Sequence, residues 1–463
     1  MTTTNQAALA ARMQSEFAPR LMAQLPRLGW DADQLARHQT RRLRTLLAAA
    51  QQRSPFHARR LAHVDPARFE LADLYCLPTM TKTDLMTSFD QLVTDPRINR
   101  RLVEEQLRAS QCEPALLLGE YVCLASGGSS GQRGVFVQTI SEYAEHAASI
   151  LRYPVAGMLA AGRSPDGTVI ALAAAAAPVH STRFLAAALG GDPVKMVPVP
   201  VTIPLADAVD RLNELQPDVL VGYPSRVAQL AAEQRAGRLK ITPHSVGTTS
   251  EMLTDASRRT ITAAFGVPVL NSFASTEGLA GASDPGGTPI SFATDLCLVE
   301  LVDQAGRPVP AGTPSTRVLL TNLHNLTQPL IRYELADSFT AAPASQPGGY
   351  LRATVQGRDD GILRYGDVNI HAHAIRSVLV SAHAVTEYQV RQTGRGIDVA
   401  VIAGADLDRS ALTSALATSL QRAGLTDPQV TVRVVASIEL NPDTGKARRF
   451  VPVGGNGPIA APG

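Results

Sequence analysis

The chain has 463 residues, of which 45% are hydrophobic and 18% are charged, and its formal net charge is +2. This composition is that of a globular protein, and so long a chain is expected to form two or three domains. No run of Lys or Arg forms a basic stripe, which argues against nucleic acid as a partner. The longest apolar run, residues 169–179, is too short to span a bilayer, so no membrane partner is expected.

The N-terminus and the cysteines indicate the compartment. Residues 1–22 can form an amphipathic helix but lack the apolar core of a signal peptide. No two cysteines form a CxxC pair, which favours reduced, buried thiols. The cysteines are Cys76, Cys112, Cys123 and Cys297. These features predict a cytoplasmic protein.

Residues 1 to about 110 favour helices. Three leucines recur at helical spacing within residues 41–53, and Ser54-Pro55 ends that helix. Another helix is expected near residue 81, with Thr81 or Thr83 as its N-cap.

From about residue 120 the pattern changes to alternating strands and helices, which predicts a largely parallel sheet covered on both faces. Strands are expected at 168–174, 218–222 and 267–270. Helices are expected at 225–236 and from a Thr254 cap to Gly266. Residues from about 284 to 345 are rich in Gly and Pro with short strands, as in a small β-subdomain.

A domain boundary is expected near Gln356-Gly357. The following strands (362–364, 398–402, 430–435) and helices (374–382, 407–423) fit a compact α+β unit over 357–453. The tail, 454–463, is predicted to be disordered. The fold class is therefore α/β, with a large multi-sheet N-terminal domain over 1–356 and a small mobile C-terminal lid domain.

A Gly/Ser-rich stretch over residues 124–134 lies between two apolar runs, 121–124 and 135–137. Glycine permits close backbone approach, so successive N–H groups can converge on an anion, and serine hydroxyls add donors. The spacing is not that of a Walker loop, since no lysine follows the last glycine. Taken alone, such a turn favours a plain β-hairpin.

Five later segments decide between these interpretations. They are Ser250–Met252, Asn271–Gly278, Ile331–Asp337, Gly357–Asp360 and Asn441–Arg448. Each charged residue in them, taken singly, is better explained as a surface or turn residue. Together they supply what a nucleoside triphosphate requires, namely carboxylates for Mg²⁺ and ribose, an aromatic ring for the base, and a mobile cation.

In order and spacing, these segments resemble the adenylate-forming superfamily of acyl-CoA synthetases, adenylation domains and luciferases, especially the phenylacetate–CoA ligase branch. The family's Ser-Gly-Thr-Thr-Gly loop is similar to residues 127–131, and its aromatic-x-x-Thr-Glu motif to 273–277. Its Arg-Tyr-x-x-x-Asp, Gly-Arg-x-Asp and Gly-Lys-x-x-Arg motifs are matched at 332–337, 357–360 and 445–449. Segments 54–56 and 77–85 also resemble that branch, so the likeness covers nearly the whole chain.

The resemblance implies a set of nucleotide-binding residues. They are Ser129, Ser130 and Gly131 for the β- and γ-phosphates; Ser250, Glu251 and Phe273 for adenine; Thr276 for the α-phosphate; Glu277 for Mg²⁺; and Asp337 with Arg358 for the ribose. Thr276, Glu277 and Lys446 are the expected catalytic residues, and Asp360 the hinge for rotation of the C-terminal domain. Lys446 would bridge the substrate carboxylate and the α-phosphate.

The implied reaction has two halves. A carboxylate and ATP give an acyl-adenylate and pyrophosphate, and a thiol then takes the acyl group. The expected enzyme is an AMP-forming acid–thiol ligase that activates a small, aromatic carboxylic acid and transfers it to CoA. The chain is expected to be a monomer or a homodimer.

Three departures from the family pattern keep alternatives open. The phosphate loop has Gln132-Arg133 where a lysine is usual, which leaves a non-catalytic nucleotide-binding protein as one alternative. Asp367 stands about where a glycine borders the pantetheine tunnel, so a carrier-protein thiol or an amine is an alternative acceptor. Residues 278–294 contain neither Cys nor His, so no zinc is expected.

The acid pocket is expected to be formed by scattered residues. They are His180, Tyr223, Gly247, Ser272 and Ala274. His180 is equally well explained as a satisfied histidine at a helix start.

Overall fold

A computed structural model gives the fold. It describes residues 2–110, 114–126, 134–174, 184–186, 189, 194–335, 337–343, 349–358, 362–366, 368–382, 384–439, 449–451 and 453. None of the described helices is long and apolar enough to cross a membrane.

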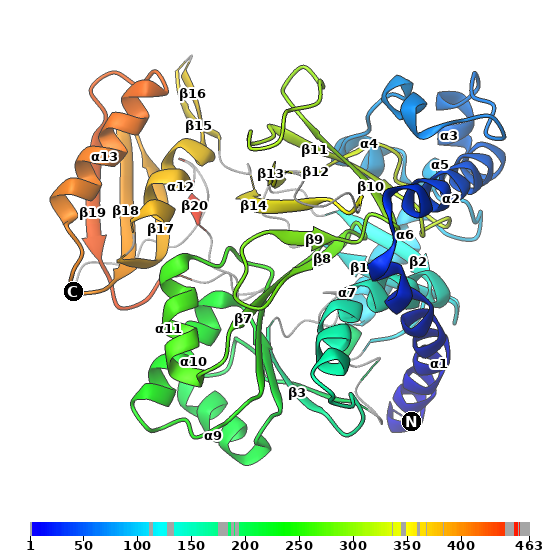
Figure 1. The fold of residues 1–463 in the computed structure, drawn as a ribbon. Coiled ribbons are helices and arrows are strands. Elements are labelled where there is room, and N and C mark those ends of the chain that lie inside the picture. The colour runs from blue at the N-terminus through cyan, green and yellow to red at the C-terminus, as the bar shows by residue number, and fades with distance from the viewer. Residues whose placement is uncertain are drawn as a thin grey trace.

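Helices dominate the N-terminal part, as the sequence predicts (Figure 1). They are α1 (Thr2–Gln24), η1 (Leu25–Gly29), α2 (Ala32–Arg53), α3 (Pro55–Arg60), η2 (Leu71–Cys76), α4 (Lys82–Thr87), α5 (Phe89–Leu92) and α6 (Arg100–Ala109). Thr81 caps α4 in a capping box with Asp84, and Ser54 ends α2 and caps α3. Hydroxyl and carboxylate caps satisfy backbone N–H groups that a helix start leaves free.

A nine-stranded sheet forms the centre of the molecule, in the order β13-β14-β9-β8-β7-β6-β5-β3-β4. The parallel strands are β3 (Val169–Ala173), β4 (Lys195–Pro198), β5 (Val219–Gly222), β6 (Ser245–Thr249) and β7 (Val269–Ala274). The sheet continues antiparallel through β8 (Ala280–Ser283), β9 (Ile290–Phe292), β14 (Arg352–Arg358) and β13 (Asp337–Ala341). The predicted parallel sheet is thus confirmed for five strands, and the other four come from the stretch that follows.

Helices cover both faces of this sheet. Residues of α9 (Leu205–Leu215), α10 (Pro224–Arg235) and α11 (Asp255–Phe265) share one apolar cluster with Leu220, Val246 and Val269 of the strands. The long helix α7 (Ile140–Ala160) contacts β7 and β8, and α1 packs against α7 (Figure 1). The predicted strand at 267–270 begins two residues later, at Val269, and runs on to Ala274. Gly266 ends α11 in a left-handed conformation, at the predicted residue.

Two smaller sheets lie beside the large one. β1 (Tyr121–Ala125) and β2 (Val135–Thr139) form the antiparallel hairpin expected around the Gly/Ser-rich loop. β10 (Cys297–Val302), β11 (Arg317–Asn322) and β12 (Tyr333–Leu335) form a three-stranded sheet.

The C-terminal unit has its own sheet and core. It contains β15 (Ile362–Tyr365), β16 (Val368–His371), α12 (Ala372–Ser381), β17 (Val385–Thr393), β18 (Gly396–Ala403), α13 (Arg409–Arg422), β19 (Gln429–Val434) and β20 (Phe450–Val451). Its four-stranded sheet has the order β19-β18-β17-β20. The sequence pattern missed β17 because the buried polar residues Glu387 and Gln389 interrupt its apolar run. Strand β14 continues through the predicted boundary at 356–357 to Arg358.

Candidate active site

The turn between β7 and β8 holds the predicted Thr276-Glu277 pair. The Ser275 N–H donates to the Leu279 carbonyl at 2.9 Å, and the Leu279 N–H donates to Ser275 Oγ at 3.3 Å, which close the turn. Glu277 is buried, and its Oε2 has no hydrogen-bond partner among the described residues. Burying a carboxylate oxygen without a partner costs free energy, and binding a divalent cation would supply that partner. This side chain therefore fits the expected Mg²⁺ role.

Phe273 lies four residues before Glu277, at the end of β7. Its ring packs edge-on against Phe292 and Phe339, with centroids 5.5 and 5.4 Å away. Phe339 belongs to β13, two residues after Asp337, so the ring connects the Thr-Glu turn to the strand with the predicted ribose ligand.

Asp337 and Arg358 are direct cross-strand partners at one end of the β13–β14 ladder. The Asp337 side chain is buried. The pairing brings together two predicted ribose-binding positions that are 21 residues apart in the sequence.

Ser250 and Glu251 follow the carboxyl end of β6. Ser250 has a φ of +68°, a left-handed conformation that is uncommon for a residue with a side chain. Glu251 Oε2 accepts hydrogen bonds from Ser225 Oγ at 2.7 Å and from the Ser225 N–H at 3.3 Å, near the N-terminus of α10. One of its oxygens is thus occupied by the start of that helix, where a negative charge is favourable.

The described residues predicted to form the acid pocket share one face of the sheet. Side chains alternate along strands, and the registers pair Val221 with Gly247 and Gly247 with Leu270. Gly247, Ser272, Ala274 and the position of Tyr223 therefore lie opposite the face that α9, α10 and α11 cover. Tyr223 itself is fully buried.

Several predicted residues lie outside the described part of the chain. They are Ser129, Ser130, Gly131, His180, Asp360 and Lys446, together with Asp367. The neck of the Gly/Ser loop is described: the Ser126 N–H donates to the Gly134 carbonyl, and the Gly134 N–H to Ser126 Oγ, both at 2.9 Å. At the other end of the chain, Arg449, three residues after Lys446, is described.

Arg332, in the Arg-Tyr-x-x-x-Asp motif, faces the N-terminal helices. Its Nε and Nη2 donate to the two carboxylate oxygens of Glu300 at 3.0 and 2.9 Å, and Nη1 donates to the carbonyls of Tyr75 and Leu77. This arginine therefore attaches the N-terminal region to the three-stranded sheet.

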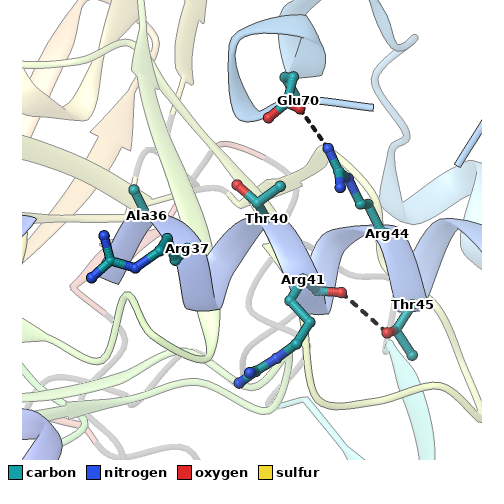
Figure 2. A pocket seen from close by; sticks show the side chains of 7 residues that line it. All are labelled: Ala36, Arg37, Thr40, Arg41, Arg44, Thr45 and Glu70. Atoms are coloured by element: carbon teal, nitrogen blue, oxygen red, sulfur yellow. Dashed lines mark hydrogen bonds and ion pairs between the residues drawn. The ribbon is translucent and has the colours of Figure 1, made fainter. Parts of the chain in front are cut away.

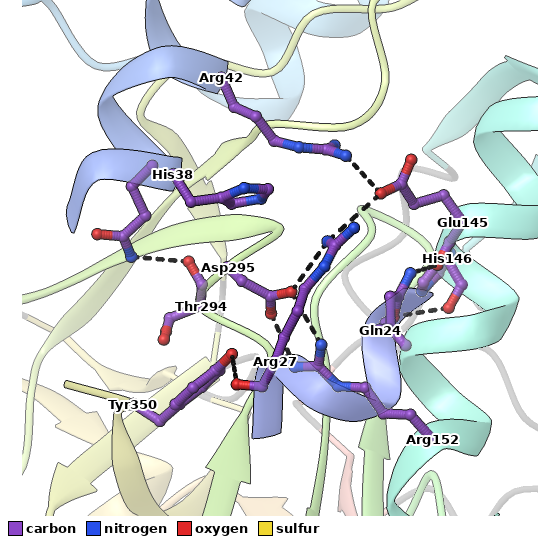
Figure 3. Close-up of polar contacts among 12 residues, drawn as sticks. Gln24, Arg27, His38, Arg42, Glu145, His146, Arg152, Thr294, Asp295 and Tyr350 are labelled. Carbon is purple, nitrogen blue, oxygen red and sulfur yellow. Dashed lines mark hydrogen bonds and ion pairs between the residues drawn. The ribbon is translucent and has the colours of Figure 1, made fainter. Parts of the chain in front are cut away.

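A buried ion cluster joins the N-terminal helices to α7 and the loop before β10 (Figure 3). Arg152 donates to both oxygens of Asp295 at 2.9 and 2.7 Å, and Arg27 Nη1 lies 3.3 Å from the same carboxylate. Burial by itself would raise the pKa of Asp295, but Arg152 and Arg27 hold it below its ordinary value. Sequence inspection missed this cluster because its members are far apart in the chain.

A cavity of about 590 Å³ lies along α2 and beside Glu70 (Figure 2). It is lined by Ala36, Arg37, Thr40, Arg41, Arg44, Thr45 and Glu70. None of these is a predicted site residue. Among the described residues, no group of three or more His, Cys, Asp or Glu could hold a metal ion.

Comparison with known sequences gives a partial match. No family model matches the chain. A stretch of 135 residues is 30% identical to the protein CapK of Staphylococcus aureus, over 28% of this chain and 28% of CapK. The match thus spans little more than a quarter of that relative.

Comparison with solved structures gives a match to nearly the whole chain. 2-Hydroxyisobutyryl-CoA ligase in its postadenylation state, in complex with 2-HIB-AMP, is 19% identical with a TM-score of 0.70, covering 92% of this chain and 91% of that one. The same ligase in the thioesterification state, with 2-HIB-AMP and CoA, gives a TM-score of 0.57 at 19% identity, covering 91% and 90%. The amide bond synthetase McbA from Marinactinospora thermotolerans gives 0.50 at 16% identity, covering 70% and 67%.

These likenesses show the fold. The chain has the α/β fold found in 2-hydroxyisobutyryl-CoA ligase and in the amide bond synthetase McbA, as the motif resemblance predicts.

Proposed function

We propose that the protein is an AMP-forming acid–thiol ligase that adenylates a small carboxylic acid and transfers the acyl group to CoA. The observation that carries this proposal is the likeness of fold, over 92% of the chain, to an enzyme whose structure holds an acyl-adenylate. The aromatic nature of the acid rests on the resemblance to the phenylacetate–CoA ligase branch alone. The neighbour's acid is the aliphatic 2-HIB, so both acid classes belong in the test.

The first half-reaction would take place between the Thr-Glu turn and the β13–β14 strands. A carboxylate oxygen attacks the α-phosphorus of ATP, the bond to the bridging oxygen breaks, and pyrophosphate leaves. Asp337 and Arg358 would hold the ribose, with Phe273 and Glu251 at the adenine. Mg²⁺ held by Glu277 would neutralise phosphate charge, and Lys446 would stabilise the charge that builds on the α-phosphate.

In the second half-reaction the thiol sulfur attacks the acyl carbonyl, and AMP leaves with the bridging oxygen. A rotation of the C-terminal unit about Asp360 would withdraw Lys446 and admit the acceptor. Among the described residues, few side-chain hydrogen bonds join that unit to the large domain, which supports such a movement. Ser257 and Thr254 donate to the Thr386 carbonyl at 3.0 and 3.4 Å, and Arg449 donates to the Met252 carbonyl at 3.5 Å.

The acceptor has a second candidate. McbA, which shares the fold, is named as an amide bond synthetase, and Asp367 departs from the tunnel glycine. An amine or a carrier-protein thiol is therefore the alternative acceptor, and product analysis with CoA, a carrier protein and simple amines separates the three.

Acid-dependent ATP–pyrophosphate exchange tests the proposal. Aromatic acids and short aliphatic acids, 2-hydroxyisobutyrate included, are offered to the wild type, to Lys446→Ala and to the exposed-lysine control Lys240→Ala. We expect exchange with one or a few acids, a loss of roughly 10²- to 10³-fold in Lys446→Ala, and no loss in the control. ATP binding without exchange for any acid would instead support the non-catalytic alternative.

A further inference from the structure

The end of β11 and the segment that leads from it to β12 are polar and yet buried. Asn322, His324, Asn325 and Gln328 expose 1%, 5%, 5% and 0% of their surface. Buried amides are tolerated only when their hydrogen bonds are made, so the partners of this segment show what it holds.

One end of the segment holds the Thr-Glu turn. Asn322 Nδ2 donates to the Glu277 carbonyl at 2.8 Å, and His324 Nε2 lies 3.3 Å from the Gly278 carbonyl. Gly278 has a φ of +108°, and a Cβ there would lie 2.2 Å from Asn322 Nδ2. The backbone that carries Glu277 is therefore fitted closely onto these two side chains.

The other end holds the strand that leaves the Gly/Ser loop. Gln328 Oε1 accepts from the Val137 N–H at 3.0 Å, and Gln328 Nε2 donates to the Val135 carbonyl at 3.2 Å. Asn325 Nδ2 donates to the Val137 carbonyl at 3.1 Å. These bonds begin one residue beyond Gly134, at the neck of the loop.

The segment is also bonded within itself, so its two ends cannot move independently. Asn322 Oδ1 accepts from the N–H groups of His324 and Asn325 at 2.9 and 3.0 Å, and Asn325 Oδ1 accepts from the Gln328 N–H at 2.8 Å. Glu142 of α7 adds a third anchor, since it accepts from the Leu326 N–H at 2.8 Å and from Thr327 Oγ1 at 2.7 Å.

We propose that Asn322, Asn325 and Gln328 are positioning residues that fix the phosphate-binding hairpin and the Glu277 turn at a constant separation. This inference rests on the proposed function, in which the hairpin would hold the β- and γ-phosphates and Glu277 would hold the metal. It predicts that the three residues affect the binding of MgATP. AMP lacks the β- and γ-phosphates and relies on the adenine and ribose sites. A displacement of about 1 Å between binding groups can cost up to about 100-fold in function.

Binding of MgATP and of AMP to the full chain, measured by calorimetry, tests this inference. In Gln328→Met we expect the dissociation constant for MgATP to rise about 10- to 100-fold and that for AMP to change less than about twofold. Gln51→Met is the matched control, because Gln51 Nε2 also donates to two carbonyls, of Leu61 and Val64, but among the N-terminal helices. We expect it to bind both nucleotides as the wild type does.

Asn322→Ser gives the same comparison from the turn side, and it replaces Gln328→Met if that variant does not fold. In the double variant Asn322→Ser/Gln328→Met, the loss of MgATP binding free energy should be smaller than the sum of the two single losses, because both residues hold the same segment. Equal weakening of MgATP and AMP, or additive losses, would overturn the inference. A wild type that binds neither nucleotide would overturn the proposed function itself.

Discussion

Two buried arginine–carboxylate pairs lie in different regions of the molecule and differ in how their charges are set. Arg152 and Asp295 lie within the large domain, and both side chains are fully buried. Arg449 and Glu387 lie where the C-terminal unit meets the large domain, with Nη1 2.8 Å from Oε1. Asp295 has a second cation, Arg27, and its pKa is lowered, whereas burial raises the pKa of Glu387 to about 7 in spite of Arg449.

The difference shows which of the two ion pairs can change its charge with pH. Asp295 stays ionised, and an arginine cannot release its proton, so the first pair is fixed. Glu387 can take up a proton near neutral pH, so the negative charge of the second pair depends on pH. Under the proposed function, the first pair belongs to the domain that would bind nucleotide and the second to the unit that would rotate.

The largest loss of stability is expected from Asp295→Asn. It leaves Arg152 and Arg27 without their carboxylate in a buried site, which costs about 3–5 kcal/mol of unfolding free energy. Urea unfolding of Asp295→Asn measures this loss, and Asp398→Asn is the control variant. Asp398 pairs with Arg433 at 2.6 Å on the surface of the C-terminal unit, so its loss should stay below about 1 kcal/mol. Equal losses would contradict the contrast.

Arg449→Met is expected to cost less, with a loss that depends on pH. The folded-state pKa of Glu387 lies above its ordinary value of 4.5, so the folded chain binds the extra proton and the stability it provides is lost as pH rises through about 7. Arg449 opposes this elevation of the pKa, so its removal raises the folded-state pKa of Glu387 further, and between pH 6 and pH 8 we expect the variant to lose about 1–2 kcal/mol more stability than the wild type loses. Thermal unfolding at both pH values measures this, and a loss independent of pH would show that Glu387 stays ionised.

The large domain should be sensitive to acid because of its buried histidines. Burial lowers the pKa of His146 to about 3 and that of His57 to about 3. Below the unfolded value of about 6.5 the unfolded chain takes up protons first, so stability is full above that pH and falls toward pH 4 by about 1.4 kcal/mol per unit for each histidine. His146→Leu should reduce this slope and the exposed His63→Leu should not, as measured by denaturant unfolding between pH 4 and 7.

The smallest effect is expected from Ser257→Ala. It removes the hydrogen bond from α11 to the Thr386 carbonyl and the one that Ser257 Oγ accepts from Thr254 Oγ1, and it leaves the Thr254 cap in place. The loss should be about 0.5–1.5 kcal/mol, concentrated at the contact between the two regions. Faster hydrogen exchange in β17, with that of β6 unchanged, would measure it. Faster exchange in both strands would mean that the two regions open together.

Much of the fold and of the candidate site can be predicted from local sequence. The capping box at Thr81, the Gly266 end of α11 and the Gly/Ser hairpin are properties of a few adjacent residues, and the structure has each of them. The catalytic and hinge roles of Lys446 and Asp360 stay predictions, because both residues lie outside the described part of the chain.

The tertiary contacts between segments that are far apart in the chain could not be predicted from the sequence. Strand β17 was hidden because tertiary contacts, with Arg449 among them, make Glu387 a buried residue. By its sequence, the Asn322–Gln328 segment resembles an ordinary polar loop. In the structure, its amides form hydrogen bonds to Glu277 on one side and to Val137 on the other.

The sequence by itself determined the periodicity, the caps and the order of the motifs, since these depend on neighbouring side chains and their backbone preferences. Only the tertiary structure decided that Asp337 and Arg358 are register partners on strands β13 and β14 and that Asp295 pairs with Arg152. The physical reason is that strand register and the burial of charge depend on the whole packed core, which no local window of the chain contains.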